Sequence, residues 1–146
     1  MHHITIRPMT IDDYDAVIAL LQKTEGVSIR DADSLEATQR YLARNPNLSF
    51  VATEKGAVIG CIMAGHDGRR GYLQHLAVAT THRNRGIASH LIENSLAELE
   101  RLGIYKSHID VLQSNASAQR YWKAKGWVLR ADIRKYSTVR GGGGNA

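Results

Sequence analysis

Cysteine, proline and phenylalanine are scarce in this chain of 146 residues, which has one cysteine, two prolines and one phenylalanine. The single cysteine, Cys61, cannot form an intrachain disulfide, and this favours a reducing compartment. No run of about eighteen apolar residues occurs, and the first residues lack the apolar core of a signal peptide. We therefore expect a cytoplasmic protein with no membrane partner.

Several motifs of catalysis and ligand binding are also missing. Neither G-x-x-x-x-G-K-S/T nor a G-x-G-x-x-G after a strand-like segment is found, which excludes the common nucleotide-binding loops. The seven histidines include no pair four residues apart, so we predict no metal site. Cys61 stands in the apolar segment 58–63, where a buried side chain is the expected state rather than a nucleophile.

The charge is basic, with 19 Lys and Arg against 14 Asp and Glu and a formal net charge of +5. A basic chain favours an anionic partner, which charge alone leaves as a nucleic acid or a polyphosphate cofactor. The basic residues are spread along the chain, and the aromatic residues form no interleaved stacking platform. These two features argue against a nucleic-acid partner.

Hydrophobic periodicity and turn residues predict an alternation of strands and helices. Predicted strands cover residues 3–7, 48–53, 57–64, 72–78 and 108–112, followed by a final β-region from Trp127 to Val139. Predicted helices begin near Thr10 and at Ser34, and cover 86–102 and 116–125. This order predicts an α+β fold, a mixed α/β sheet with helices on both faces. Residues 1–140 form one predicted domain, and 141–146 form a Gly-rich tail that we expect to be disordered.

The junction between predicted strand 72–78 and helix 86–102 gives the strongest indication of a ligand-binding site. The first turn of a helix has backbone N–H groups without intrahelical partners and a partial positive charge, and both favour a phosphate. Gly86 would let the backbone approach phosphate oxygens, and two arginines add charge. Taken alone, the same residues also fit a simple turn with solvated arginines.

Two motifs, in order, resemble those of one protein family. Arg83, Gly86 and Ala88, preceded by the Leu-Ala-Val segment 76–78, match the acyl-CoA signature Arg/Gln-x-x-Gly-x-Gly/Ala of the GNAT superfamily of N-acetyltransferases. The block from Asn115 through Ala118 to Gly126-Trp127 resembles the later motif of that superfamily. The turn 65–71, Gly-x-Asp-Gly-x-Arg-Gly, resembles a subgroup of small bacterial members.

The resemblance implies a GNAT-like sheet, mostly antiparallel, in which the fourth and fifth strands splay to hold the pantetheine arm of acetyl-CoA. Leu76 is the implied catalytic position, because its backbone N–H would bind the thioester carbonyl. An amine would then attack the thioester directly in a ternary complex, without an acyl-enzyme. The implied residues for binding acetyl-CoA are Leu76, Ala77, Val78, Arg83, Asn84, Arg85, Gly86, Ile87, Ala88, Ser89, Asn115 and Trp122.

One position departs from the family pattern. Relatives often have, four residues before the glycine, a tyrosine that protonates the leaving thiolate, and this chain has Trp122 there. At about 100° per residue, Tyr121 would point roughly 120° away from Asn115 around the helix. The general-acid role is therefore assigned to neither residue. A non-catalytic acyl-CoA sensor of the same fold is the alternative function.

The acceptor side is less well marked. Strict alternation along the strand places Tyr72 and Gln74 on the face of Leu76 and His75 on the opposite face, as a packed or partly exposed histidine. Gln74 and Glu25 are the candidate substrate-binding residues, although a solvated acidic loop explains Glu25 equally well. Because Tyr72 and Gln74 are weak bases, we expect an acceptor of low pKa, a small-molecule amine or an α-amino group. A homodimer is compatible with the sequence.

Overall fold

Five strands form one sheet in the order β1-β2-β3-β4-β5 in a computed structural model that describes residues 3–146; Met1 and His2 lie outside the described residues. The strands are β1 (Ile4–Pro8), β2 (Phe50–Glu54), β3 (Ala57–His66), β4 (Gly71–Val78) and β5 (Ser107–Ile109). Neighbouring strands pair antiparallel from β1 to β4, whereas β4 and β5 are parallel. The mixed, mostly antiparallel sheet predicted from the sequence is confirmed.

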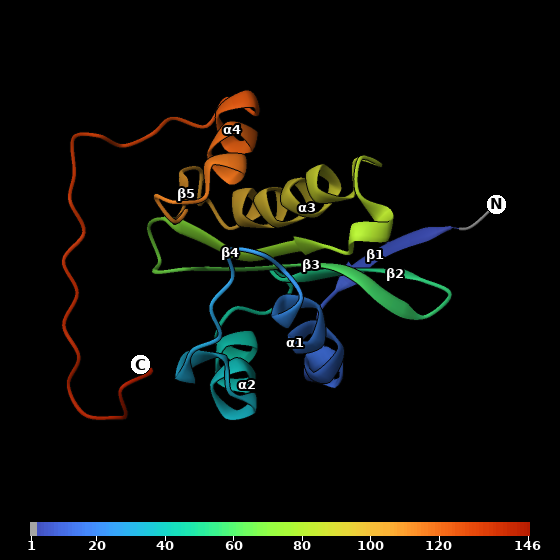
Figure 1. The fold of residues 1–146 in the computed structure, drawn as a ribbon, viewed down its shortest axis with the longest axis horizontal. Coiled ribbons are helices and arrows are strands. Elements are labelled where there is room, and N and C mark those ends of the chain that lie inside the picture. The colour runs from blue at the N-terminus through green and yellow to red at the C-terminus, as the bar shows by residue number, and fades with distance from the viewer. Residues whose placement is uncertain (1–2) are drawn as a thin grey trace.

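Helices cover both faces of this sheet, as predicted (Figure 1). On one face lie α1 (Tyr14–Gln22) and α2 (Leu35–Arg44), and on the other lie α3 (Ile87–Arg101) and α4 (Ala116–Ala124). Short 3₁₀ turns occur at Ile11–Asp13, Asp31–Asp33 and Thr80–His82. Ser34 caps α2 through its Oγ, which accepts from the N–H of Ala37 at 3.1 Å. Within residues 3–146, no helix has the length and apolar character needed to cross a membrane.

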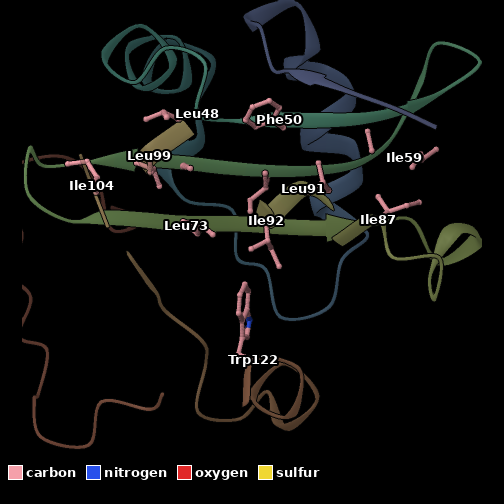
Figure 2. Packing of buried hydrophobic residues seen from close by; sticks show 13 residues of the cluster. Leu48, Phe50, Ile59, Leu73, Ile87, Leu91, Ile92, Leu99, Ile104 and Trp122 are labelled. Carbon is pink, nitrogen blue, oxygen red and sulfur yellow. The ribbon is translucent and has the colours of Figure 1, made fainter. Parts of the chain in front are cut away.

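A separate hydrophobic core fills each side of the sheet. The larger one lies beneath α3, where Leu91 and Leu99 are fully buried, and Figure 2 shows Trp122 reaching from α4 toward it. The smaller one lies beneath α1 and includes Val17, Leu21, Val51, Cys61, Met63 and Ala77. Burial raises the pKa of the Cys61 thiol to about 12, so the expected buried, unreactive cysteine is confirmed.

The C-terminal segment differs from the prediction. Within the described chain, residues 127–146 form no strand, so the predicted β-region from Trp127 to Val139 is wrong. The segment leaves α4 and runs outside the sheet toward the side of α2 (Figure 1). Its alternating apolar residues suit a strand locally, but a strand needs a partner edge, and the sheet ends at the three-residue β5. Apolar side chains such as Leu129, 88% exposed, consequently face solvent.

Candidate active site

Strands β4 and β5 separate soon after they meet. Their pairing runs only from Gly71↔Ser107 to Leu73↔Ile109, although β4 continues to Val78. The predicted fifth strand, 108–112, is therefore shorter than expected, because the chain turns away after Ile109. A cleft of about 1770 Å³ opens at this divergence, with residues 74–78 of β4 on one wall and 110–112 on the other. This is the splayed arrangement that the family resemblance implies.

A β-bulge interrupts β4 at the cleft. The register passes from Met63↔Gln74 directly to Cys61↔Ala77, so β4 has two residues where β3 has one. His75 occupies the bulge with φ of 54°, in the left-handed region. The extra residue reverses the alternation: Leu76 packs against the core beneath α3, whereas Gln74 pairs with Met63 of the core beneath α1.

The bulge overturns part of the sequence interpretation. Gln74 and Leu76 lie on opposite faces, and Tyr72 lies with Gln74, because its register partner Gly65 faces Tyr41 of α2. His75 is on the α1/α2 side as well, in contact with Asp33. The prediction that Tyr72 and Gln74 share the face of Leu76 is therefore wrong, because strict alternation does not survive an inserted residue.

The start of α3 has the form of an anion site. Gly86 precedes the helix with φ of 77°, and within residues 3–146 the first turn has neither a side-chain cap nor an acidic residue. A β-carbon at Gly86 would find its nearest neighbour, Cδ2 of His90, only at 4.0 Å. Open space before unpaired helical N–H groups fits a pyrophosphate. The cleft is lined here by His82, Arg83, Asn84, Gly86, Ile87, Ala88 and Ser89, whereas Arg85 points to solvent outside this wall.

Helix α4 closes the opposite wall of the cleft. Oδ1 of Asn115 accepts from the N–H of Ala118 at 3.0 Å and caps the helix, which leaves Nδ2 facing the loop at Gly26. Nζ of Lys125 donates to Oγ of Ser89 at 2.8 Å and links α4 to the first turn of α3.

Both aromatic residues of α4 line the cleft. Trp122 is 7% exposed and packs edge-on against Trp127 with ring centroids 4.6 Å apart. The hydroxyl of Tyr121 is buried and has no hydrogen-bond partner within residues 3–146. Helical phasing predicts that Tyr121 points away from Asn115. Both residues nevertheless line the cleft.

The end of the cleft where the sequence predicts the acceptor is built from the α1–α2 loop and from α2. Residues 24–28, which include Glu25, line it together with Tyr41, Gln74 and His75. Burial raises the pKa of Tyr41 to about 12, so this phenol stays neutral at physiological pH. Nε2 of His75 lies 2.6 Å from Oδ1 of Asp33, and the side chains are 16% and 12% exposed. No local pattern predicts this pair, because the two residues are 42 positions apart and only the fold brings them together.

Comparison with known proteins places this geometry in a family. Residues 14–127 match the model of the acetyltransferase (GNAT) family. An acetyltransferase of Pectobacterium atrosepticum is 34% identical over 110 residues, which cover 75% of this chain and 77% of that protein. An acetyltransferase of Sodalis glossinidius has the same identity and coverage.

Solved structures share the fold at lower identity. Ard1 from Thermoplasma volcanium superposes with a TM-score of 0.77 at 22% identity, over 88% of this chain and 84% of that one. The aminoglycoside N-acetyltransferase AAC(6')-Iy in complex with CoA gives 0.76 at 21% identity, over 94% and 96% of the two chains. With the family match over most of its length and these relatives, the chain belongs to the GNAT family of acetyltransferases.

Proposed function

We propose that this acetyltransferase moves the acetyl group of acetyl-CoA to a primary amine, which attacks the thioester directly in a ternary complex. The open N-terminus of α3 at Gly86, beside the unpaired edge of β4, is the observation that carries the proposal. In this arrangement the N–H groups of 84–89 hold the pyrophosphate, the backbone of 76–78 pairs with the pantetheine arm, and Asn115 and Trp122 bound the slot. The N–H of Leu76 stabilises the charge that develops on the thioester oxygen.

An acyl-enzyme has no support in the described chain. Cys61 is fully buried in the core beneath α1, and burial raises the pKa of its thiol to about 12. A thiol in that state is neither accessible nor ionised near neutral pH. Direct attack by the acceptor is consistent with a solved relative: AAC(6')-Iy was crystallised with a bisubstrate analogue that joins CoA to an acetylated aminoglycoside.

The proposed acceptor is a small-molecule amine or an α-amino group. A lysine ammonium with a pKa of about 10.4 becomes neutral at a cost of roughly 4 kcal/mol near pH 7.5, whereas an α-ammonium at about 7.7–8.0 costs under about 1 kcal/mol. Glu25 at the mouth of the acceptor end supplies a carboxylate that attracts a cationic substrate. Structural neighbours include enzymes named for small amines, an aminoglycoside and 2,4-diaminobutyric acid.

The test measures release of free CoA thiol from acetyl-CoA with a panel of amines: amino acids, dipeptides, polyamines and aminoglycosides. Calorimetry with acetyl-CoA alone is run beside it. We expect binding of acetyl-CoA and turnover with at least one amine of low pKa. Binding without turnover would favour the acyl-CoA sensor, a function that Trp122 in the place of the usual tyrosine also suits. The absence of binding would refute both.

A further inference from the structure

The pair formed by His75 and Asp33 fixes which ring nitrogen carries the hydrogen. Oδ1 of Asp33 lies 2.6 Å from Nε2 of His75, and Oδ2 accepts from the N–H of Arg30 at 2.9 Å. A carboxylate oxygen accepts the hydrogen bond, so in the neutral imidazole Nε2 is the donor and Nδ1 keeps its lone pair. Among residues 3–146, Nδ1 has no hydrogen-bond partner, and His75 forms part of the cleft wall.

The surrounding elements hold both members of the pair in place. The Cys61 thiol of β3 donates to the carbonyl of His75 at 3.2 Å, on the inner side of the bulge. The Tyr14 hydroxyl of α1 donates to the carbonyl of Asp33 at 2.6 Å. The bulge also makes His75 the residue immediately before Leu76, whose N–H we assign to the thioester. A strained left-handed residue, held at its carbonyl and at its ring beside a reaction centre, is typical of a functional position.

We propose that His75 is the general base of the reaction and that Asp33 is its positioning residue; this rests on the proposed function. Nδ1 takes one proton from the acceptor ammonium and leaves a neutral amine. The amine nitrogen bonds to the thioester carbon, the carbon–sulfur bond breaks, and the second nitrogen proton goes to the departing sulfur as the amide forms. The imidazolium then returns its proton to solvent, so the net products are the amide, free CoA thiol and one proton.

The electrostatic surroundings suit this role. The Tyr14 hydroxyl of α1 and the Cys61 thiol of β3 bond the backbone carbonyls of the pair. Three further titratable side chains, Tyr41, Glu25 and Arg30, line the same cleft. Tyr41 and Cys61 remain neutral across the working range because burial raises the pKa of each to about 12. The Asp33 carboxylate is therefore the charge in direct contact with the imidazole, and it stabilises the imidazolium that forms. Such a base also deprotonates an α-ammonium more readily than a lysine ammonium, because the lysine ammonium has the higher pKa.

The first experiment compares His75→Gln with wild type, using the fastest amine of the panel. Glutamine can still donate to Asp33 but cannot take up a proton. We expect kcat at pH 7.5 to fall about a hundredfold or more while the Kd of acetyl-CoA stays within twofold. The loss should shrink as pH rises toward 9.5, because the amine then deprotonates unaided. His3→Gln is the matched control, since His3 is exposed before β1 and is not part of the cleft wall.

The second experiment tests positioning without relying on turnover. Long-range nitrogen–proton NMR of histidine-labelled protein reports the tautomer, and we expect hydrogen on Nε2 of His75 in wild type and a mixed or reversed tautomer in Asp33→Asn. Asp33→Asn should also lower kcat more than tenfold with KM little changed. In His75→Gly, which accepts the positive φ of the bulge, added imidazole should restore part of the activity.

The outcomes separate the two proposals. A hydrogen on Nδ1 in wild type overturns the base assignment whether or not an acceptor is found, and so does a His75→Gln variant that keeps kcat within threefold with an unchanged pH profile. In the latter case turnover by wild type leaves the acetyltransferase proposal standing. If wild type turns over none of the amines, the proposed function fails and the base assignment fails with it. Should His75→Gly not fold, the glutamine variant and the NMR measurement still decide.

Discussion

Gly26 lies directly against the side-chain amide of Asn115: a β-carbon on Gly26 would come within 2.5 Å of Nδ2. The contact joins the α1–α2 loop, which carries Glu25, to the cap of α4 across the cleft. The loop that would receive the acceptor and the helix that bounds the proposed pantetheine slot are thus in mutual contact. A change at Gly26 should therefore affect both ends of the cleft.

Gly26→Ala should destabilise the protein more than Gly56→Ala. Both glycines have positive φ, 83° and 80°, so both variants carry the same backbone strain of about 1 kcal/mol. Only at position 26 must a neighbour move, because nothing lies within 4 Å of a β-carbon at Gly56. Thermal unfolding of the two variants isolates the cost of displacing Asn115, which we expect at roughly 1–2 kcal/mol. Equal melting temperatures would show that Asn115 yields freely.

Gly86→Val should abolish the stabilisation by acetyl-CoA, because the new side chain occupies the open space before α3. At ligand concentrations about a hundred times Kd, wild type should gain about 2.7 kcal/mol of stability from binding. Gly68→Val is the control: its φ of 93° imposes similar strain, and its side chain also meets open space, but in the turn before β4. The control should keep the full ligand-induced shift of Tm. If Gly86→Val keeps the ligand-induced shift of Tm, the pyrophosphate does not bind at this site.

Asp13→Asn should lower stability at neutral pH but not in acid. Asp13 is 7% exposed and receives two hydrogen bonds from Arg7, at 2.7 and 2.8 Å. The hydrogen bond from Arg7 is the main cause that lowers the pKa of Asp13. A depressed carboxyl pKa contributes stability above the unfolded value of about 3.9, and this stability is lost as pH falls through the folded value.

At pH 7 we expect the free energy of unfolding to be about 1–2 kcal/mol lower for Asp13→Asn than for wild type. A fully buried ion pair would contribute more, but the Arg7 side chain is 42% exposed. Urea unfolding between pH 3 and pH 7 measures it. The difference should begin to shrink below about pH 4 and should disappear as the pH passes the lower, folded-state pKa of Asp13. Asp12→Asn, an exposed acid in the same turn, should show little effect at any pH. A pH-independent difference would mean that packing, not charge, is responsible.

Local signals in the sequence predicted most of the fold. The Ser34 cap, the apolar stripe of α3 and the Gly86 helix start each depend on residues within a few positions of one another, so the sequence reveals them directly. The sequence does not reveal the bulge at His75, because the inserted residue is a histidine rather than a glycine. The strand pattern also continues on both sides of it. The prediction of a final β-region was wrong for a related reason. Residues 127–139 have the composition of a strand, but distant residues decide whether a sheet edge is free to pair with them.

Removing residues 141–146 should change Tm by about 1 °C or less. Asn145 makes exposed contacts with the α1–α2 loop: its carbonyl accepts from the N–H of Asp31, and its side chain bonds Ile29 and Arg30. Ordering four consecutive glycines costs more conformational entropy than a few solvent-exposed hydrogen bonds return. A fall of several degrees would show that the tail docks, and Asn145→Ala would then separate these contacts from the glycines.

Tyr121→Phe should retain most of kcat. A thiol has a pKa of about 8.5, so the CoA thiolate is a tolerable leaving group near neutral pH and needs no dedicated acid. The Tyr121 hydroxyl is buried without a partner within residues 3–146, so its removal should not lower stability. Trp122→Phe is the packing control: it removes part of a 7%-exposed indole from the core and should cost roughly 1–3 kcal/mol of unfolding free energy.

A loss of about a thousandfold in kcat for Tyr121→Phe, with KM unchanged, would show that the phenol donates its proton only in the transition state. The cleft allows that result, because Tyr121 stands in its wall one residue from the usual position. The pH profile distinguishes the two mechanisms. Without an acid, the rate should rise with the ionisation of the amine and stay level at high pH. With Tyr121 as the acid, the rate should fall again at high pH, where the phenol has lost the proton that it must donate.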